Sequence, residues 1–85
     1  MEKFPRILVV DDEPINIEVM SSMLTAKKLK NDEARCGLAA IEIIKKRLTQ
    51  VQSGEAPHFY KILILDYSMP DITGVEVATK VITLI

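Results

Sequence analysis

The sequence predicts an α/β fold built on a small parallel sheet. Two apolar runs, Ile7–Val10 and Ile62–Leu65, each end at acidic residues. Continuous runs of this length, rich in β-branched residues, are typical of parallel strands that are covered on both faces. Helical patterns follow the expected strands, so the chain should read βαβαβα with strand order 2-1-3 and helices on both faces of the sheet.

The first expected strand covers residues 6–10, and a helix follows it. Pro14 suits the first helical position, with Asp12 or Glu13 as the cap before it. This helix should extend to residue 26. Apolar residues recur along it at a helical spacing that predicts its buried face: Ile17, Met20, Met23 and Leu24.

The middle of the chain should hold a second strand and a second helix. Asn31 and Asp32 indicate a turn, residues 32–36 a short strand with a weak pattern, and Gly37 a further turn. The helix then covers residues 38–52, ahead of the loop-forming residues 53–57. Its apolar face should consist of Ile41, Ile44, Leu48 and Val51.

The last third of the chain should form a strand, a loop and a helix. Residues 60–65 form the third expected strand. Thr73 and Glu76 fit a capping box, in which each of the two residues caps the other's backbone. A third helix over residues 75–85 follows, although its many Val, Ile and Thr residues are also compatible with a strand.

Composition limits the classes of function. The 85 residues suffice for one small domain, residues 1–85, and 48% hydrophobic residues favour a packed core. Eleven basic and twelve acidic residues give a net charge of −1 without a basic stripe, which argues against nucleic-acid and membrane-surface binding. A single cysteine, no apolar membrane span and no apolar signal core at the start lead us to expect a cytoplasmic domain.

Three carboxylates should converge at one edge of the sheet. Asp11 and Asp12 end the first expected strand, Asp66 ends the third, and parallel neighbours end at the same edge. Like-charge repulsion should raise at least one pKa unless a cation compensates, and Mg²⁺ is the natural partner for oxygen ligands. Asp66 could then attack phosphorus and form an aspartyl phosphate. Either acidic site alone would suit simple helix capping, but the two together favour a metal or phosphate site.

Two segments of the sequence resemble the signature motifs of response-regulator receiver domains. They are ILVVDDEP at residues 7–14 and DYSMPDITG at residues 66–74, and ARCGLAA at residues 34–40 resembles the family's link into its second helix. The resemblance implies a flavodoxin-like doubly wound sheet. It also implies that Asp66 accepts the phosphoryl group and that Asp11, Asp12, Asp66 and the backbone carbonyl of Ser68 hold Mg²⁺.

The sequence departs from the family pattern in ways that bear on signalling. The complete family fold has five βα units, and this sequence contains three. The family's switch Thr or Ser, its aromatic switch residue and its phosphate-pairing Lys have no counterpart here. Lys80 falls inside the last expected helix and does not fill that role, while Thr73 replaces a common acidic residue.

The leading interpretation is a phosphoacceptor in a two-component phosphorelay. A histidine kinase or a histidine phosphotransfer protein would donate the phosphoryl group, and any catalysis would be limited to phosphorylation and dephosphorylation of Asp66 itself. A receiver-like binding module that is never phosphorylated is the alternative. A magnesium-dependent phosphohydrolase fits poorly, because Ser68 stands where that class has a second acid. The third strand, left as an edge, should also promote self-association.

Overall fold

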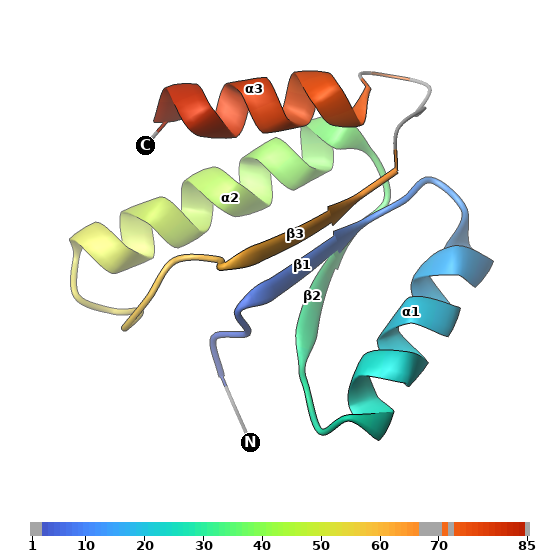
Figure 1. The fold of residues 1–85 in the computed structure, drawn as a ribbon. Coiled ribbons are helices and arrows are strands. Elements are labelled where there is room, and N and C mark those ends of the chain that lie inside the picture. The colour runs from blue at the N-terminus through green and yellow to red at the C-terminus, as the bar shows by residue number, and fades with distance from the viewer. Residues whose placement is uncertain (1–2, 67–70, 72, 85) are drawn as a thin grey trace.

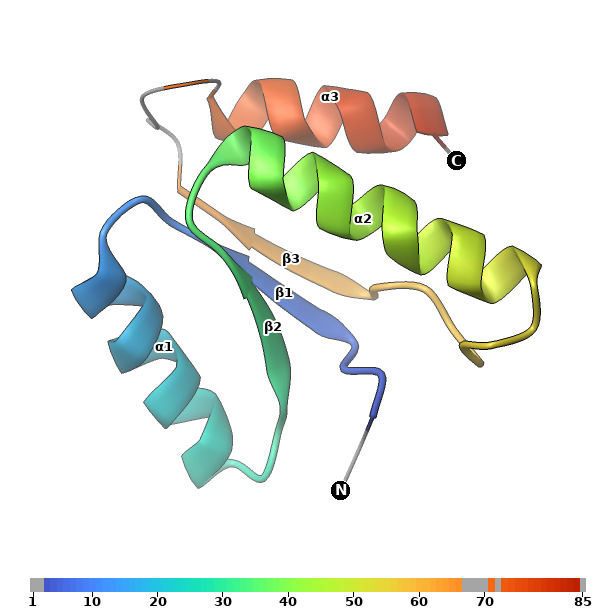
Figure 2. The same cartoon turned by 180° about the vertical axis from the view of Figure 1, so that it is seen from behind.

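The computed structural model describes residues 3–66, 71 and 73–84 of the 85-residue chain. Strands β1 (Ile7–Val10), β2 (Asn31–Ala34) and β3 (Ile62–Leu65) form a parallel sheet in the order β2-β1-β3. Helices α1 (Pro14–Ala26), α2 (Gly37–Gln52) and α3 (Gly74–Leu84) follow the strands in turn. Figures 1 and 2 show α1 on one face of the sheet and α2 beside α3 on the other. The predicted fold class and strand order are confirmed.

Strand β1 is the centre of the molecule, and every one of its side chains is at least 95% buried. Successive side chains of a strand point to opposite faces, so β1 contributes to two cores. Leu8 and Val10 pack with residues of α2 and α3, whereas Ile7 and Val9 pack with Ile17 of α1. A continuous apolar run is therefore required here, because neither face of β1 meets water.

Strand β3 is less buried than its sequence suggested. Ile62 is 51% exposed, and the other three residues of the strand are half-buried. Within the part of the chain that the structure describes, β3 pairs with β1 on one side and has no strand on the other. Its register with β1 matches Val10 to Leu65, so the residues that follow these two leave the sheet side by side.

Helix α1 begins at Pro14 and has one of the two predicted residues, Glu13, at its N-cap, but its buried face differs from the prediction. Glu13 is the N-cap residue and makes no capping hydrogen bond with its side chain. The prediction that Met23 belongs to the core is wrong, because its side chain is 61% exposed. At about 100° per residue, Met23 lies roughly 120° around the helix from the buried Ile17.

The second strand lies one or two residues earlier than expected. It begins at Asn31 and ends at Ala34, so the predicted turn at residues 31 and 32 is wrong. Pairing with β1, in which Asn31 lies opposite Ile7, overrides the turn preference of Asn and Asp. Cys36 precedes α2 as its N-cap residue, and the helix includes Gly37.

The elements of the last third are placed as predicted, with small shifts at their ends. Strand β3 begins at Ile62 rather than at residue 60. The capping box of α3 is confirmed: the Thr73 hydroxyl accepts from the Glu76 N–H, and the Glu76 carboxylate accepts from the Thr73 N–H, both at 3.2 Å. None of the helices in the described ranges combines the length and the apolar character that crossing a bilayer requires.

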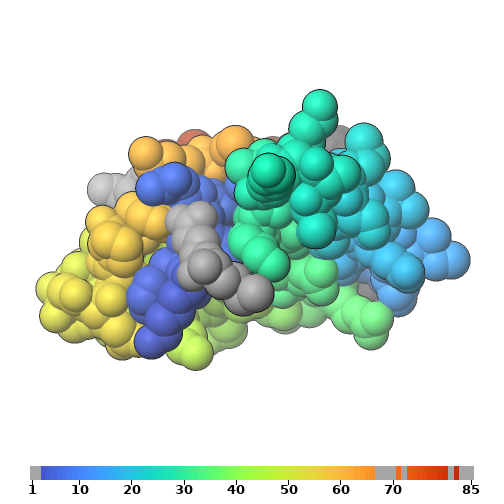
Figure 3. Space-filling view, turned by 90° about the horizontal axis from the view of Figure 1, so that it is seen from below, coloured from blue at the N-terminus to red at the C-terminus, as the bar shows by residue number. Residues whose placement is uncertain are grey.

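A buried arginine closes the end of the sheet where the strands begin. Arg47 of α2 is 3% exposed, and its guanidinium donates to the carbonyl oxygen of Pro5 at 2.8 Å and to the carboxylate of Asp32 at 3.1 Å. It also lies over the ring of Tyr60, whose hydroxyl donates to the same carboxylate. Figure 3 views this end, with the blue N-terminal segment between the yellow to orange residues before β3 and the teal residues before β2.

Candidate metal and phosphoryl site

The three carboxylates predicted to converge do so at the carboxyl ends of β1 and β3. Asp11 and Asp12 follow β1 directly, and Asp66 follows β3 directly. Each of these half-buried residues offers one carboxylate oxygen, and the three oxygens lie within 4.8 Å of one another. The register of the two strands produces this proximity, because parallel neighbours that are level at Val10 and Leu65 must also be level one residue later.

Backbone hydrogen bonds extend the sheet by one residue and hold the acidic residues in place. The Asp11 N–H donates to the Ala34 carbonyl at 3.1 Å, and the Asp66 N–H donates to the Val10 carbonyl at 2.9 Å. The Asp11 Oδ1 atom accepts from the Glu13 N–H at 2.9 Å, which fixes one side of that carboxylate. The backbone of Asp11 and Asp66 therefore continues the sheet.

The electrostatics of the cluster favour either a proton or a cation. Partial burial raises the pKa of Asp12 above its ordinary value, and the hydrogen bond and negative charge of Asp66 raise it further. The prediction that clustering raises a pKa is thus confirmed, but burial contributes more than the repulsion we expected. A divalent cation among these oxygens would oppose the rise in pKa, since it favours the ionised form of each carboxylate.

The donor set fits a small hard cation. Mg²⁺ prefers carboxylate oxygens at ~2.1 Å in octahedral geometry and keeps several waters. Oxygens on opposite sides of such an ion are ~4.2 Å apart. Three carboxylate oxygens within 4.8 Å of one another span about that distance, so this triad could hold one metal ion.

Gly74 lies against the backbone of the proposed nucleophile. A Cβ atom at this position would collide with the carbonyl oxygen of Asp66 and crowd the Leu65 side chain. The glycine therefore lets the start of α3 approach the end of β3.

The remaining residues singled out from the sequence lie away from the triad or outside the description. Lys80 is an exposed residue of α3. The predicted metal contact at Ser68 lies outside the described residues, as do Tyr67, Met69 and Pro70.

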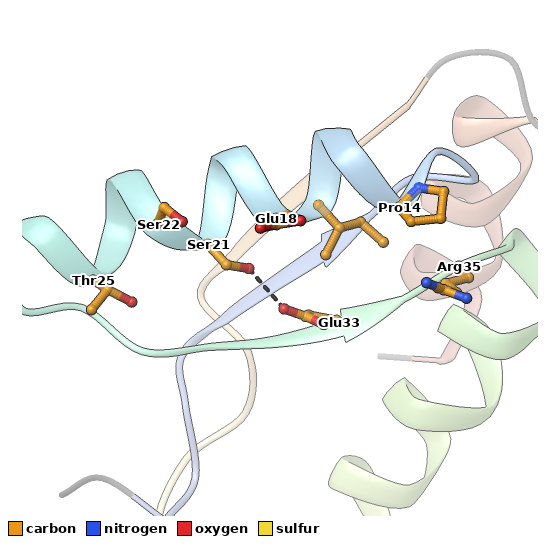
Figure 4. Close-up of a pocket in the computed structure, with 8 residues that line it drawn as sticks. Pro14, Glu18, Ser21, Ser22, Thr25, Glu33 and Arg35 are labelled. Carbon is orange, nitrogen blue, oxygen red and sulfur yellow. Dashed lines mark hydrogen bonds between the residues drawn. The ribbon is translucent and has the colours of Figure 1, made fainter.

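Among the residues that the structure describes, a hollow lies on each side of α1, and the one beside β3 includes two of the three carboxylates. A groove of about 320 Å³ between α1 and β3 is lined by Asp11 and Asp66 together with mainly apolar side chains. A larger hollow of about 430 Å³ lies between α1 and β2, where Ser21 donates to Glu33 at 2.8 Å (Figure 4). We place the site beside the smaller groove, because two of the three residues that could hold a metal ion, Asp11 and Asp66, line it.

One residue near the site was missed by the sequence analysis. The Asp71 carboxylate accepts hydrogen bonds from the backbone N–H groups of Gly37 and Leu38, at the start of α2. Its two partners are 34 and 33 residues away in the sequence. No local pattern predicts such a contact, although Asp71 lies within the DYSMPDITG motif of residues 66–74.

A comparison with protein families identifies the chain. The model of the response regulator receiver domain matches residues 7–84. The chain belongs to this family. The match covers all six helices and strands described above, and the resemblance noted in the sequence is therefore confirmed.

The relatives of this receiver domain include kinases and regulators. Hybrid signal transduction histidine kinase L of Dictyostelium discoideum is 34% identical over 76 residues, which are 89% of this chain and 4% of the kinase. The two-component response regulator ARR11 of Arabidopsis thaliana is 35% identical over 78 residues, 89% of this chain and 13% of the regulator. The chain thus spans a small part of the length of these relatives.

Solved structures share the fold. The response regulator TrrA from Thermotoga maritima, solved in complex with Mg²⁺-BeF, is 34% identical with a TM-score of 0.69, over 95% of this chain and 61% of that one. The receiver domain of Ssk1 from Saccharomyces cerevisiae, solved with the phosphotransfer protein Ypd1, gives 24% identity and a TM-score of 0.74, over 98% and 51%. A relative of this chain thus has a structure that contains Mg²⁺.

Proposed function

We propose that residues 1–85 form a receiver unit in which Asp66 accepts a phosphoryl group in a two-component phosphorelay. The observation that carries the proposal is the meeting of Asp66 with Asp11 and Asp12 at one edge of the sheet. Acceptor chemistry needs a carboxylate nucleophile beside a group of oxygens that can hold a cation. Membership of the receiver family and the Mg²⁺-BeF complex of TrrA support this assignment.

The chemical step would be carried by one carboxylate oxygen of Asp66. This oxygen attacks the phosphorus of a phosphohistidine, the new O–P bond forms as the P–N bond breaks, and the electron pair remains on the imidazole nitrogen, which then takes a proton. Asp11, Asp12, Asp66 and the backbone carbonyl of Ser68 are the proposed Mg²⁺ ligands. When bound, the ion would neutralise charge on the transferred group and keep the carboxylates ionised.

The proposed donor is a histidine kinase or a histidine phosphotransfer protein. The kinase relative from Dictyostelium is a hybrid signal transduction histidine kinase, and the Ssk1 receiver domain was solved with the phosphotransfer protein Ypd1. We extend that pairing to this chain. The phosphoryl donor then approaches the edge of the sheet at which β1 and β3 end.

Small-molecule phosphorylation tests the proposal without a cognate kinase. We expect incubation of the 85-residue chain with Mg²⁺ and acetyl phosphate to add one phosphoryl group, read by intact mass spectrometry. Omission of Mg²⁺ should remove most of the uptake. A folded sample that takes up nothing would contradict the proposal and favour a binding module that is never phosphorylated.

The Asp12→Asn variant should bind Mg²⁺ far more weakly than the wild type. Loss of one ligand charge from the site should lower the affinity by at least tenfold, measured by calorimetric titration, and Asp12→Ala should do the same. A matched control is Glu18→Gln, which removes a carboxylate of α1 that lines the other hollow. An unchanged affinity in Asp12→Asn would refute the metal assignment.

When no metal is present, the Asp12→Asn variant should be more stable than the wild type at neutral pH. The pKa of Asp12 is raised in the folded state, so the metal-free wild type loses stability as the pH rises through the range above 3.8. Asp12→Asn lacks this ionisation and should melt higher than the wild type at pH 7, with the difference vanishing in acid. Thermal melts with and without Mg²⁺ give both results.

We also propose that copies of the 85-residue chain associate with one another. They would pair along the edge of β3 that faces away from β1. The Ile62 N–H donates to the carbonyl of Arg6, just before β1, and the Asp66 N–H donates to the carbonyl of Val10 in β1. The alternate N–H groups of Leu63 and Leu65 therefore face away from β1. We expect light scattering after size exclusion to show species larger than a monomer.

A charge on this edge should separate the copies. Ile62→Lys places a cation at a 51% exposed edge position and should weaken association by roughly tenfold, because a charged side chain on an edge strand opposes pairing with another strand. Leu29→Lys, at a 47% exposed position before β2, is the control and should leave association unchanged. A wild type that elutes as a monomer at all concentrations would contradict the proposed pairing.

A further inference from the structure

Strand β2 forms the edge of the sheet that lies opposite to β3. In the described part of the chain it pairs with β1 alone. The Ala34 carbonyl accepts from the Asp11 N–H at 3.1 Å, so the backbone groups of Ala34 face β1. Backbone groups alternate in direction along a strand, and those of Glu33 and Asn31 therefore face outward. An edge of this kind can accept another strand.

This edge carries two opposite charges. Glu33 lies in β2, Arg35 follows the strand directly, and both residues are exposed. Residues two apart in an extended chain point to the same face, and the backbone is still extended at Cys36, with φ −156° and ψ 165°. Glu33 accepts from Ser21 at 2.8 Å, whereas Arg35 has no ion pair or hydrogen bond through its side chain among the described residues. The guanidinium of Arg35 can therefore bind a carboxylate from outside its own chain.

Helix α1 lies over β1 and leaves room beside β2. Ile17 of α1 packs with Ile7 and Val9 of β1, at the centre of the sheet. A hollow of about 430 Å³ lies between α1 and β2, and Glu33 and Arg35 line it (Figure 4). A strand that approaches in the plane of the sheet can therefore reach β2, and its side chains can enter this hollow.

We propose that β2 pairs with β2 of a second copy of this chain, antiparallel and about a two-fold axis. With Ala34 opposite Ala34 of the second copy, Glu33 of each copy lies opposite Arg35 of the other. The outward backbone groups of these two residues then face each other, so each pair gains hydrogen bonds as well as an ion pair. The small Ala34 side chains meet at the axis, where opposed Cα atoms approach to about 4.5 Å. Two-fold symmetry forms both pairs twice and closes the contact.

The charges select both this register and a second copy as the partner. An antiparallel register with Glu33 opposite Glu33 of the other copy, or a parallel pair in register, would place like charges opposite each other. Charges on an edge strand usually prevent pairing, but here the two signs alternate on one face and complement themselves in an antiparallel copy. Strand β3 is the opposite edge, so this pairing leaves the groove beside Asp66 open. Copies that also pair at β3 would form species larger than a dimer.

The test is a charge swap in the 85-residue chain that carries Ile62→Lys, so that pairing at β3 is weakened equally in every sample. Glu33→Arg places two cations opposite each other in both symmetric pairs, and Arg35→Glu places two anions there. We expect each variant to weaken self-association by about tenfold, measured by sedimentation equilibrium up to about 1 mM chain. An equimolar mixture of the two variants restores opposite charges in both pairs and should associate as tightly as the Ile62→Lys parent.

The matched control is Lys45→Glu, which makes the same change of charge as Arg35→Glu at an exposed position of α2 and should associate like the parent. The outward N–H of Glu33 should also exchange with solvent more slowly as the chain concentration rises, measured by NMR. A parent that remains monomeric up to about 1 mM would overturn the pairing. So would a mixture that associates no better than either variant alone. If Glu33→Arg does not fold, Arg35→Glu is compared with Lys45→Glu, and equal association of these two overturns it.

Discussion

Replacing Asp66 by asparagine will abolish phosphoryl uptake from acetyl phosphate. The amide oxygen of asparagine carries no negative charge and is a poor nucleophile toward phosphorus, so the new O–P bond cannot form at this position. Asparagine has nearly the same shape as aspartate, and the backbone bond from residue 66 to Val10 does not involve the side chain. We therefore expect a folded variant whose mass does not change, against one added phosphoryl group in the wild type.

The control for this result must separate the loss of the nucleophile from the loss of the metal. Asp66→Asn also removes a proposed Mg²⁺ ligand, so the reaction is run with Mg²⁺ well above the dissociation constant measured for the variant. Glu18→Gln, with one carboxylate fewer elsewhere, should be phosphorylated like the wild type. Phosphoryl uptake by Asp66→Asn, mapped to Asp11 or Asp12 by peptide mass, would show that the acceptor is assigned to the wrong member of the triad.

The sequence was a good guide to the sheet and to the carboxylates. The run Ile7–Val10 is apolar on both faces because β1 is covered on both faces, and this is the condition under which run length alone identifies a strand. Once strands β1 and β3 are adjacent and parallel, the residues after them must meet. The convergence of Asp11, Asp12 and Asp66 therefore follows from topology and register rather than from any detail of side-chain packing.

The parts that the sequence did not predict depend on partners that are distant in the chain. Strand β2 has a polar sequence and is a strand because β1 pairs with it, so its start at Asn31 has no local signal. The cap formed by Asp71 on α2 joins residues more than thirty positions apart. Arg47 stands next to Lys45 and Lys46, which are exposed, and nothing in this basic run marks it as the buried member.

Removal of the Arg47 side chain will have the largest effect on stability. Arg47→Ala deletes two charge-assisted hydrogen bonds, to Pro5 and Asp32, and the stacking of the guanidinium on Tyr60. A buried pair that loses one member typically costs 3–5 kcal/mol, and the partial exposure of Asp32 favours the lower end. We expect the free energy of unfolding, from urea titration, to fall by about 3 kcal/mol.

Two further variants show which part of the arginine matters. Arg47→Lys keeps the charge but loses the planar fork that reaches two acceptors, so it should recover less than half of the loss. Lys45→Ala, at the exposed neighbour, should change stability by less than about 0.5 kcal/mol.

The hydroxyl of Tyr60 also contributes to this cluster. Burial and the hydrogen bond to Asp32 raise the pKa of Tyr60, so its hydroxyl remains a donor at neutral pH. Tyr60→Phe removes this hydrogen bond and should lower the free energy of unfolding by about 1 kcal/mol.

The arginine cluster and the carboxylate site lie at opposite ends of the sheet, which makes their effects separable. Arg47 contacts residues before β1 and β3, whereas Asp11, Asp12 and Asp66 follow these strands. Under conditions where Arg47→Ala is folded, it should therefore bind Mg²⁺ and take up phosphoryl groups like the wild type. A loss of stability no greater than that of Lys45→Ala would contradict the packing described for α2. A loss of Mg²⁺ affinity in the folded variant would show that the two ends of the sheet are coupled.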